Sequence, residues 1–385
     1  MSFDDLDFDA DLTAAQLEEI EEFASRIHVE ETFRLVSLAP MVPSTVPRPV
    51  PTSDRIRKAE AAAQIEVLKR ERNAIVLGHN YMEPSLFHSI PDYRGDSLEL
   101  SRVAATTAAD IIVFCGVRFM AETAKILNPS KTVLIPSSKA GCSLAESITA
   151  QDVRDLRAMY PGVPIVTYIN TYADVKAECD ICCTSGNAVA VVESLGSEQV
   201  IFLPDEFLAR NVARETGKHI IFPVKGAGHG PDVGDTTLDV KMIGWRGRCE
   251  VHEQFNVRDI KQVRSQVPDV LVLSHPECPP DVVEASDYSG STTAMIRYVE
   301  KNKGRKFLIL TECSMADNIL ASAPDAEMLR LCSVRCPHMA EITVEDTLLA
   351  LMKTQFVVDV PEDIRVRAYK SVERMLQIGH TGPKD

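Results

Sequence analysis

The sequence predicts an α/β protein of three similar α/β/α units with parallel sheets, and three observations support this prediction. First, short apolar runs typical of buried strands alternate with helical patterns, the order that gives parallel sheets. Second, a second apolar strand begins 33 residues after the end of the first in each unit, at Ile112, Ile201 and Leu308 (112 − 79, 201 − 168 and 308 − 275). Third, each unit later presents a lone cysteine after a Gly- or Pro-rich loop: Cys142, Cys249 and Cys336.

Three equal offsets favour a true repeat over the loosely similar strand spacing of any α/β chain. Parallel units place their functional loops at the carboxyl ends of their strands. A pseudo-threefold, triangular arrangement of the units would therefore bring these loops and the three cysteines to one central cavity. We expect the active site there.

The composition limits the classes of function. The 385 residues are 45% apolar and 25% charged, as is ordinary for a globular protein. The formal net charge of −15 argues against nucleic-acid partners and against an anionic membrane surface. No apolar run approaches the ~20 residues that span a bilayer, and the acidic start, Met1–Asp5, carries no hydrophobic signal-peptide core. We expect a cytoplasmic protein whose ten cysteines are free thiols, metal ligands or redox groups.

The chain divides into five predicted segments. Residues 1–68 are an N-terminal extension and lead-in helix, with five prolines between Ser37 and Ser53. The three units span 69–155, 156–260 and 261–352, and 353–385 carries a C-terminal helix and tail. From second strand to cysteine the offsets are 30, 48 and 28 residues (142 − 112, 249 − 201 and 336 − 308). The middle unit therefore contains an insert, which we place at Gly226–Asp239.

The predicted elements follow one order within the units. First strands end just before polar clusters, and second strands lead into helices. The predicted strands are Ala74–Leu77, Asp110–Cys115, Val133–Pro136, Ile165–Tyr168, Val200–Leu203, Leu271–Ser274 and Phe307–Leu310. The predicted helices include Arg55–Arg72, Ala188–Glu193, Glu206–Glu215, Ala294–Val299, Val344–Met352 and Glu362–Gln377.

Polar side chains gather where the first strands end. They are His79 and Tyr81, Tyr168 and Asn170, and His275 and Glu277, with His252 close to the second cysteine. Hydroxyl residues stand at the helix starts that follow: Ser97, Ser185, Ser291 and Thr292. Helix N-termini favour anions, so we expect a small carboxylate or phosphate ligand and candidate acids and bases around it. Each residue alone has an ordinary explanation, since Ser and Thr are common helix caps; the prediction rests on the set.

The three lone cysteines are candidate metal ligands. Cys142, Cys249 and Cys336 together would form a soft thiolate set that suits zinc or an iron–sulfur cluster, with one metal position left open for substrate. Their spacing alone does not separate these two metals. A C-x-x-C pair, Cys179 and Cys182, is formally a zinc or thioredoxin-like motif, but no second pair accompanies it at metal-ligand spacing.

An ordered series of motifs then resembles the quinolinate synthase A family of iron–sulfur enzymes. It covers roughly residues 55–352 and includes Gly78-His79-Asn80-Tyr81, Gly95-Asp96-Ser97-Leu98, Phe114 to Glu122, Ala140-Gly141-Cys142, Tyr168 to Thr171, Cys183-Thr184-Ser185, Gly247-Arg248-Cys249-x-x-His252, His275 to Cys278 and Gly290-Ser291-Thr292. The resemblance implies three α/β/α domains in a triangle around a [4Fe–4S] cluster. It implies condensation of iminoaspartate with dihydroxyacetone phosphate to quinolinate, phosphate and water in NAD biosynthesis.

The resemblance also implies residue roles. Cys142, Cys249 and Cys336 match the cluster ligands, and Glu277, Tyr81 and His79 match catalytic groups near the open iron. The pocket for carboxylates and phosphate is implied at His79, Ser97, Tyr168, Asn170, Ser185, His252, His275, Glu277, Ser291 and Thr292. L-aspartate oxidase is the implied candidate supplier of the imine, and no nucleic-acid or membrane partner is expected.

The sequence departs from the family pattern at the third ligand. Some members carry C-x-x-C-x-x-C, whereas this chain has Cys332-x-x-x-Cys336; we choose Cys336 because Pro337 and Met339 follow it in the family manner, with Cys332 as the fallback. Two other classes stay open: an anion-binding or sensory protein with structural zinc or redox thiols, and a zinc or iron–sulfur hydro-lyase acting on another polyanion. Radical chemistry on S-adenosylmethionine is disfavoured, since the C-x-x-x-C-x-x-C loop is missing from the sequence.

Overall fold

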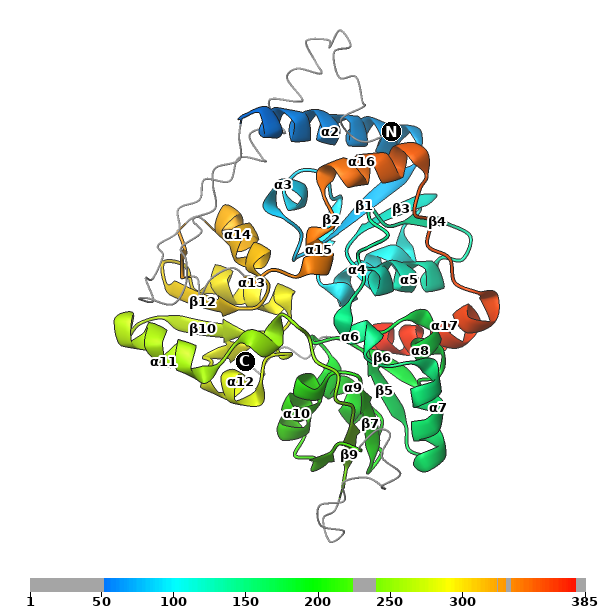
Figure 1. Ribbon diagram of the computed structural model, residues 1–385, viewed down its shortest axis with the longest axis vertical. Helices are drawn as coiled ribbons and strands as arrows, with labels where there is room; N and C mark the ends of the chain where they lie inside the picture. Colours follow the sequence, from blue (N-terminus) through cyan, green and yellow to red (C-terminus); the bar gives the residue numbers. More distant parts are fainter. Residues whose placement is uncertain (1–51, 224–239, 324, 330–333, 379–385) are drawn as a thin grey trace. The chain divides into compact units, whose positions relative to one another are not determined.

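The computed structural model describes residues 52–223, 240–323, 325–329 and 334–378. Most of the predicted N-terminal extension, the predicted insert at Gly226–Asp239 and Cys332 lie outside these ranges. Within them the fold is α/β with three parallel sheets interleaved with helices (Figure 1). The predicted fold class and the three similar α/β/α repeats are therefore confirmed, while their arrangement in a triangle and the five segment boundaries stay predictions.

The helices cover the sheets between successive strands, as parallel connections require. Those in the first half are α2 (Thr52–Glu71), α3 (Pro84–Phe87), α4 (Ser97–Thr106), α5 (Arg118–Leu127), α6 (Ser143–Glu146), α7 (Ala150–Met159), α8 (Ala173–Ala177) and α9 (Ala188–Ser194). Those in the second half are α10 (Glu206–Glu215), η2 (His252–Gln254), α11 (Val257–Gln266), α12 (Pro280–Ala285), α13 (Thr292–Lys301), α14 (Cys313–Ser322), α15 (Pro337–Ala340), α16 (Val344–Lys353) and α17 (Glu362–Gln377).

The first repeat contains a sheet of order β2-β1-β3-β4. Its strands are β1 (Ala74–His79), β2 (Tyr93–Gly95), β3 (Ile111–Cys115) and β4 (Thr132–Leu134). The central strand β3 is buried at every position, which explains its unbroken apolar sequence. Helix α16 lies against α2 beside this sheet (Figure 1).

The second repeat contains a sheet of order β6-β5-β7-β9-β8. Its strands are β5 (Ile165–Tyr168), β6 (Ile181–Cys183), β7 (Val200–Leu203), β8 (Ile220–Ile221) and β9 (Met242–Gly244). Among the described residues, strand β8 has no counterpart in the other two sheets, so the longer second repeat includes an extra edge strand. Helix α17 packs against α8 and β6.

The third repeat contains a sheet of order β11-β10-β12-β13. Its strands are β10 (Leu271–Ser274), β11 (Tyr288–Ser289), β12 (Lys306–Leu310) and β13 (Glu327–Leu329). Strand β10 pairs with β11, and β12 with β13, both in parallel. By contacts the chain divides into two compact parts, Met1–Gly141 with Val299–Asp359 and Cys142–Tyr298 with Val360–Asp385, and each is considered separately below.

The short edge strands β2, β6 and β11 were not predicted. Each is preceded by an aspartate, Asp92, Asp180 or Asp287, whose carboxylate accepts a hydrogen bond from an amide of the first strand at 2.7, 2.7 and 2.8 Å. The amide of the same aspartate donates back to the carbonyl of that strand residue at 2.9, 3.0 and 2.8 Å. This aspartate bracket pins the register of each edge strand, a role that apolar periodicity does not reveal.

Two further sequence expectations need small corrections. The second strands begin at Ile111, Val200 and Lys306, one or two residues before the positions that gave equal offsets of 33. Ser185 lies in a turn before α9, which begins at Ala188, rather than at a helix start. In the described part of the chain, no helix combines the length and apolar character needed to cross a bilayer.

Candidate active site

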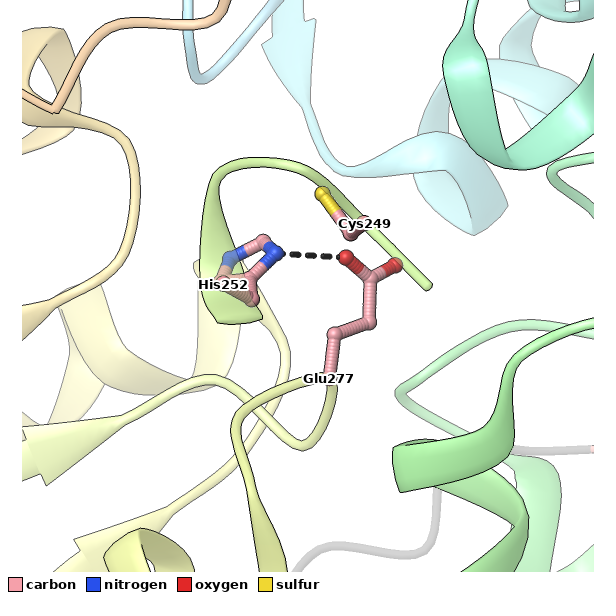
Figure 2. Close-up of side chains that lie close together, drawn as sticks. All are labelled: Cys249, His252 and Glu277. Atoms are coloured by element: carbon pink, nitrogen blue, oxygen red, sulfur yellow. Dashed lines mark ion pairs between the residues drawn. The ribbon is translucent and has the colours of Figure 1, made fainter. Parts of the chain in front are cut away.

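A buried carboxylate, Glu277, is the centre of a polar cluster in the second compact part. It stands three residues after β10, and its Oε2 lies 2.6 Å from Nδ1 of His252 and 3.8 Å from Nδ1 of His275. The two imidazole rings stack with centroids 4.7 Å apart. Figure 2 shows His252 and Glu277 pointing toward one another, with Cys249 beside them.

Three more predicted residues complete this cluster. Asn170 Nδ2 donates to Glu277 Oε1 at 3.4 Å, and the Tyr168 side chain also hydrogen bonds to Glu277. His275 Nε2 lies 3.1 Å from the Ser185 hydroxyl. Strands β5 and β10 thus bring the two strand-end clusters of the second and third repeats together, as the sequence analysis predicted for parallel strands.

The electrostatics of the cluster separate two buried acids. Burial alone would raise the pKa of Glu277, but the charges of His252 and His275, together with hydrogen bonds from His252 and Tyr168, hold it below its usual value. Asp205, the N-cap of α10, has its pKa raised well above the usual range by burial and by the charge of Glu277. When environments push two pKa values apart, the proton resides on one group and the charge on the other. The surroundings thus favour the ionised form of Glu277 and the protonated form of Asp205.

The cluster also offers metal ligands. One thiol, one imidazole nitrogen and one carboxylate oxygen, from Cys249, His252 and Glu277, all lie within 4.8 Å of one another. Burial raises the pKa of the Cys249 thiol well above its usual value, and the charges of Glu277 and Cys142 act in the same direction. A cation would relieve this repulsion and keep the thiolates ionised. The geometry of Cys249, His252 and Glu277 therefore suits a metal ion.

The first compact part carries a second group of predicted residues. The Tyr81 amide donates to Nδ1 of His79 at 3.2 Å, and the two rings meet edge to face. The Tyr81 hydroxyl lies 2.5 Å from the Thr311 hydroxyl, at the end of β12. His79 and Tyr81 are thus held together with a hydroxyl partner that the sequence analysis missed.

The three lone cysteines occupy the same local structure in all three repeats. The amide of the first residue of the helix after the second strand donates to the carbonyl two residues before each cysteine. These bonds are Arg118 to Ala140 at 2.8 Å, Glu206 to Gly247 at 2.8 Å and Cys313 to Val334 at 3.1 Å. We call this bond the cysteine-loop tether.

A single helical turn follows each cysteine. The cysteine carbonyl accepts the amide four residues on, at 3.0 Å in each repeat: Glu146 to Cys142, Glu253 to Cys249 and Ala340 to Cys336. Position 336 has both the tether and the turn, so the equivalence of Cys336 with the other two cysteines rests on backbone structure. Glu312 reinforces the third loop, because its carboxylate accepts the amides of Ser314 and Cys336; burial raises its pKa to about 7.

Gly247 shows how closely the second tether packs. A Cβ at this position would lie 2.4 Å from the Ser147 hydroxyl and 2.6 Å from the Pro204 carbonyl oxygen. Because one of these atoms belongs to the backbone, the loop could not relax cheaply. Glycine is required here by close approach rather than by an unusual φ.

The remaining predicted hydroxyl residues lie at helix starts. Ser97 is the first residue of α4, where Asp96 supplies the side-chain cap. Ser291 precedes α13 and its hydroxyl accepts the amide of Ala294, and Thr292 is the first residue of that helix. All three are buried. The capping role of Ser291 is thus observed, and the anion-binding role of all three stays a prediction.

The C-x-x-C pair is a core feature. Cys179 belongs to the hydrophobic core beneath β5, and Cys182 is fully buried within β6. Burial raises the pKa of both thiols. Both therefore have the surroundings of small buried apolar side chains, and the structure gives no support to zinc or redox chemistry at this pair.

Several site residues escaped the sequence analysis: Asp205, Thr311 and Glu312. All stand one or two positions after a second strand, where Asp205 and Glu312 cap the following helix. The signal in the sequence was a polar residue that recurs just after the second strand. Because such a residue is also the ordinary choice for a helix cap, it did not by itself point to an active site.

Comparison with known proteins gives a consistent result. Residues 63–377 match the family model described as quinolinate synthetase A protein. The chain is 54% identical over 311 residues to "Quinolinate synthase 2" of Mesorhizobium japonicum, covering 81% of this chain and 89% of that protein. It is 50% identical over 333 residues to the quinolinate synthase of Agrobacterium fabrum (86% and 90%). It is 48% identical over 325 residues to that of Caulobacter vibrioides (83% and 82%).

Proposed function

Because the chain belongs to the quinolinate synthetase A family, we propose that it condenses iminoaspartate with dihydroxyacetone phosphate to form quinolinate, phosphate and water in NAD biosynthesis. The observation that carries the proposal is the buried cluster of Glu277 with His252, His275, Tyr168 and Asn170. A carboxylate, two imidazoles and a phenol within reach of one another are groups of the kind that transfer protons in active sites. The names of the relatives support quinolinate as the product.

The residues fit a [4Fe–4S] cluster. Cys142, Cys249 and Cys336 are the proposed ligands, since each is presented by the same tether and the same helical turn. The charge of Cys142 already acts on the Cys249 thiol in the described geometry. When bound through three cysteines, such a cluster supplies one iron without a cysteine ligand, a Lewis acid for substrate oxygen.

Side chains of the protein are proposed to carry out the proton transfers. Glu277 is ionised and accepts protons from the condensing substrates, while His252 holds its Oε2 in place. Tyr81 and His79 donate or relay protons, with the Tyr81 hydroxyl oriented by Thr311. Tyr168 and Asn170 fix the other face of Glu277.

Anionic substrate groups need donors and positive potential. His275 with Ser185 is proposed to bind one carboxylate. Ser97, Ser291 and Thr292 are proposed to bind phosphate and carboxylate at the N-termini of α4 and α13. An L-aspartate oxidase is the proposed supplier of the short-lived imine.

A second candidate follows from the Cys249, His252 and Glu277 group. One thiolate, one imidazole and one carboxylate are a suitable three-ligand set for catalytic zinc. The chain would then be a zinc hydro-lyase acting on another polyanion. Metal analysis separates this alternative from the first.

The test is anaerobic purification followed by iron, sulfide and zinc analysis and a quinolinate assay. We expect about four irons and four sulfides per chain, the content of one such cluster, with turnover of the two proposed substrates. Serine at Cys142, Cys249 or Cys336 should abolish the cluster, whereas Cys179→Ala, which removes a core thiol, should keep it. Zinc without iron, or a cluster that survives loss of any of the three cysteines, would refute the assignment.

A further inference from the structure

The loops that follow the three first strands share one hydrogen-bonding arrangement. Each begins with a site residue at the strand end, His79, Tyr168 or His275. Each carries another two positions later: Tyr81, Asn170 or Glu277. The carbonyl groups one and three positions after the strand-end residue are in every case bound by a single nitrogen of one buried side chain.

Two of these donors are equivalent asparagines. Asn318 of α14 donates through Nδ2 to the carbonyls of Asn80 and Met82 at 3.1 and 2.9 Å. Asn211 of α10 donates through Nδ2 to the carbonyls of Pro276 and Cys278 at 2.8 and 3.1 Å. Both asparagines are the sixth residue of the helix that follows a second strand.

The third donor is a lysine from another helix. Lys176 of α8 donates through Nζ to the carbonyls of Ile169, at 2.9 Å, and Thr171. The sixth residue of α5, Thr123, bonds instead to the Phe119 carbonyl of its own helix. The same two carbonyls are therefore satisfied although the donor has a different chemistry and comes from a different place in the repeat.

Burial makes these contacts energetically significant. Lys176, Asn211 and Asn318 are at most 2% exposed. An unsatisfied buried carbonyl costs ~1–3 kcal/mol, and a buried ammonium needs strong dipoles around it. Both carbonyls flanking Tyr81, Asn170 or Glu277 are thus fixed, which fixes the backbone that aims each of these side chains.

We propose that Asn318, Lys176 and Asn211 are positioning residues for Tyr81, Asn170 and Glu277, and we call the arrangement the carbonyl clamp. They act through the backbone of the loops and need not touch substrate. A misplacement of about 1 Å at a catalytic group can cost ~10²-fold in rate. The clamp therefore contributes to turnover beyond its contribution to stability.

Asn211 gives the sharpest test, because the chain contains a matched control. Asn128 is also buried, and its Nδ2 donates to two carbonyls, Ala104 and Ala124, at 2.8 and 3.0 Å, away from the three loops. Asn211→Ala and Asn128→Ala should lower Tm by similar amounts. Only Asn211→Ala should lower kcat, by about 100-fold, with iron per chain unchanged.

Two further variants test whether the effect on kcat comes from the loss of the N–H donor of Asn211 or from the loss of side-chain volume. Asn211→Asp keeps the shape but replaces the N–H donors with an acceptor, so its kcat should fall at least as far as that of Asn211→Ala. Asn211→Ser retains one donor and should recover part of the loss. Should Asn211→Ala fail to fold, this pair carries the test. Equal kcat in Asn211→Asp and the unmodified chain would overturn the proposal.

The turnover readout rests on the proposed function, so a second readout is independent of it. Amide hydrogen exchange of the peptide covering residues 274–279 should be faster in Asn211→Ala than in Asn128→Ala. An unmodified chain without quinolinate turnover would refute the proposed function but leave this comparison intact. If Asn128→Ala and Asn211→Ala changed both the exchange rate and kcat to the same extent, the Asn211 contacts would contribute only to stability. This result would refute the inference.

Discussion

At the scale of single residues, Glu206 is a buried charged side chain that lies outside the Glu277 cluster but holds a loop of the candidate site in place. This first residue of α10 is 3% exposed and contacts Arg210 at 2.8 Å and Arg248 at 3.0 Å. Burial would raise the pKa of Glu206, but hydrogen bonds from the two arginines lower it overall. Arg248 directly precedes Cys249, so the ion pairs hold the same loop that the backbone tether holds.

Glu206→Gln should therefore destabilise the protein in a pH-dependent way. A carboxyl group with a lowered pKa stabilises the folded state above its unfolded pKa of about 4.3, and this contribution is lost as the pH falls through the folded value. The arginines are partly exposed, so we expect a loss of only about 1–2 kcal/mol at pH 7. Urea unfolding at several pH values should show a constant difference between pH 7 and about pH 5, which narrows as the pH falls below the unfolded pKa of about 4.3.

The ion pair of Arg365 with Glu362, whose side chain is 70% exposed, provides the control for this prediction. Glu362→Gln should leave the urea midpoint unchanged across the same pH range, because water screens the pair. A Glu206→Gln effect that is constant with pH would show that shape, not charge, matters at position 206.

Sequence reasoning at this scale selected the side chains of the Glu277 cluster but not the residues that hold them in place. His252, His275, Glu277, Tyr168, Asn170 and Ser185 were predicted and lie together in the structure. Strand-end position and residue type were enough to select them. Asp205, Glu206 and Asn211 were not selected, because their roles depend on which loop packs against α10, and no local pattern encodes that.

At the scale of elements, the cysteine-loop tether is made by the backbone alone. Arg118 is the first residue of α5, and its amide bonds to the Ala140 carbonyl. The preceding residue, Val117, has an extended backbone with ψ of 164°. Proline is well tolerated both at the first position of a helix and after an extended residue, so the tether can be removed without breaking α5.

Arg118→Pro should therefore preserve the fold and weaken metal binding. The expected outcome is an unchanged circular dichroism spectrum with faster loss of iron to a chelator, by about tenfold or more, the scale of one lost hydrogen bond of ~1.4 kcal/mol. Arg118→Ala is the matched control, since it removes the same side chain and its pairing with Glu122 but keeps the amide. Equal iron loss in both variants would contradict a role for the tether.

The sequence predicted long elements better than short ones. The C-terminal helix, Glu362–Gln377, was predicted to the residue, and the buried strands β5 and β7 were as well. The edge strands of two or three residues were missed, because alternation needs more residues to be visible. Their signal is Asp92, Asp180 and Asp287, which becomes readable only after the three repeats are aligned.

At the scale of the whole molecule, the last segment of the chain completes earlier repeats. Val357 bridges to Leu134 at the end of β4, and the Val358 amide donates to the Val133 carbonyl. Helix α17 then packs against α8 and β6 of the second repeat, where the Ser371 hydroxyl donates to the carbonyl of Lys176. Such pairings join residues far apart in sequence, and repeat analysis alone does not predict them.

Met375→Asp should consequently unfold more than the C-terminal helix. Met375 has no exposed surface, and an unpaired charge there would have to be desolvated against α8 and β6. We expect a loss of several kcal/mol, seen as a lower thermal midpoint and as faster exchange in peptides of the second repeat. Val366→Asp, on the exposed face of the same helix, should change neither. A Met375→Asp effect confined to α17 itself would contradict this dependence.

The aspartate brackets also bear on the order in which the molecule folds. They join residues 15 or 16 positions apart (92 − 76, 180 − 165 and 287 − 272), whereas the contact of Ser371 with Lys176 spans 195 positions. Short loops close with little entropy loss and within microseconds. Each edge strand can therefore pair while synthesis continues, but the second repeat waits for the last helix to leave the ribosome. The carbonyl of Lys176 therefore stays without its Ser371 partner until the C-terminal helix has been made.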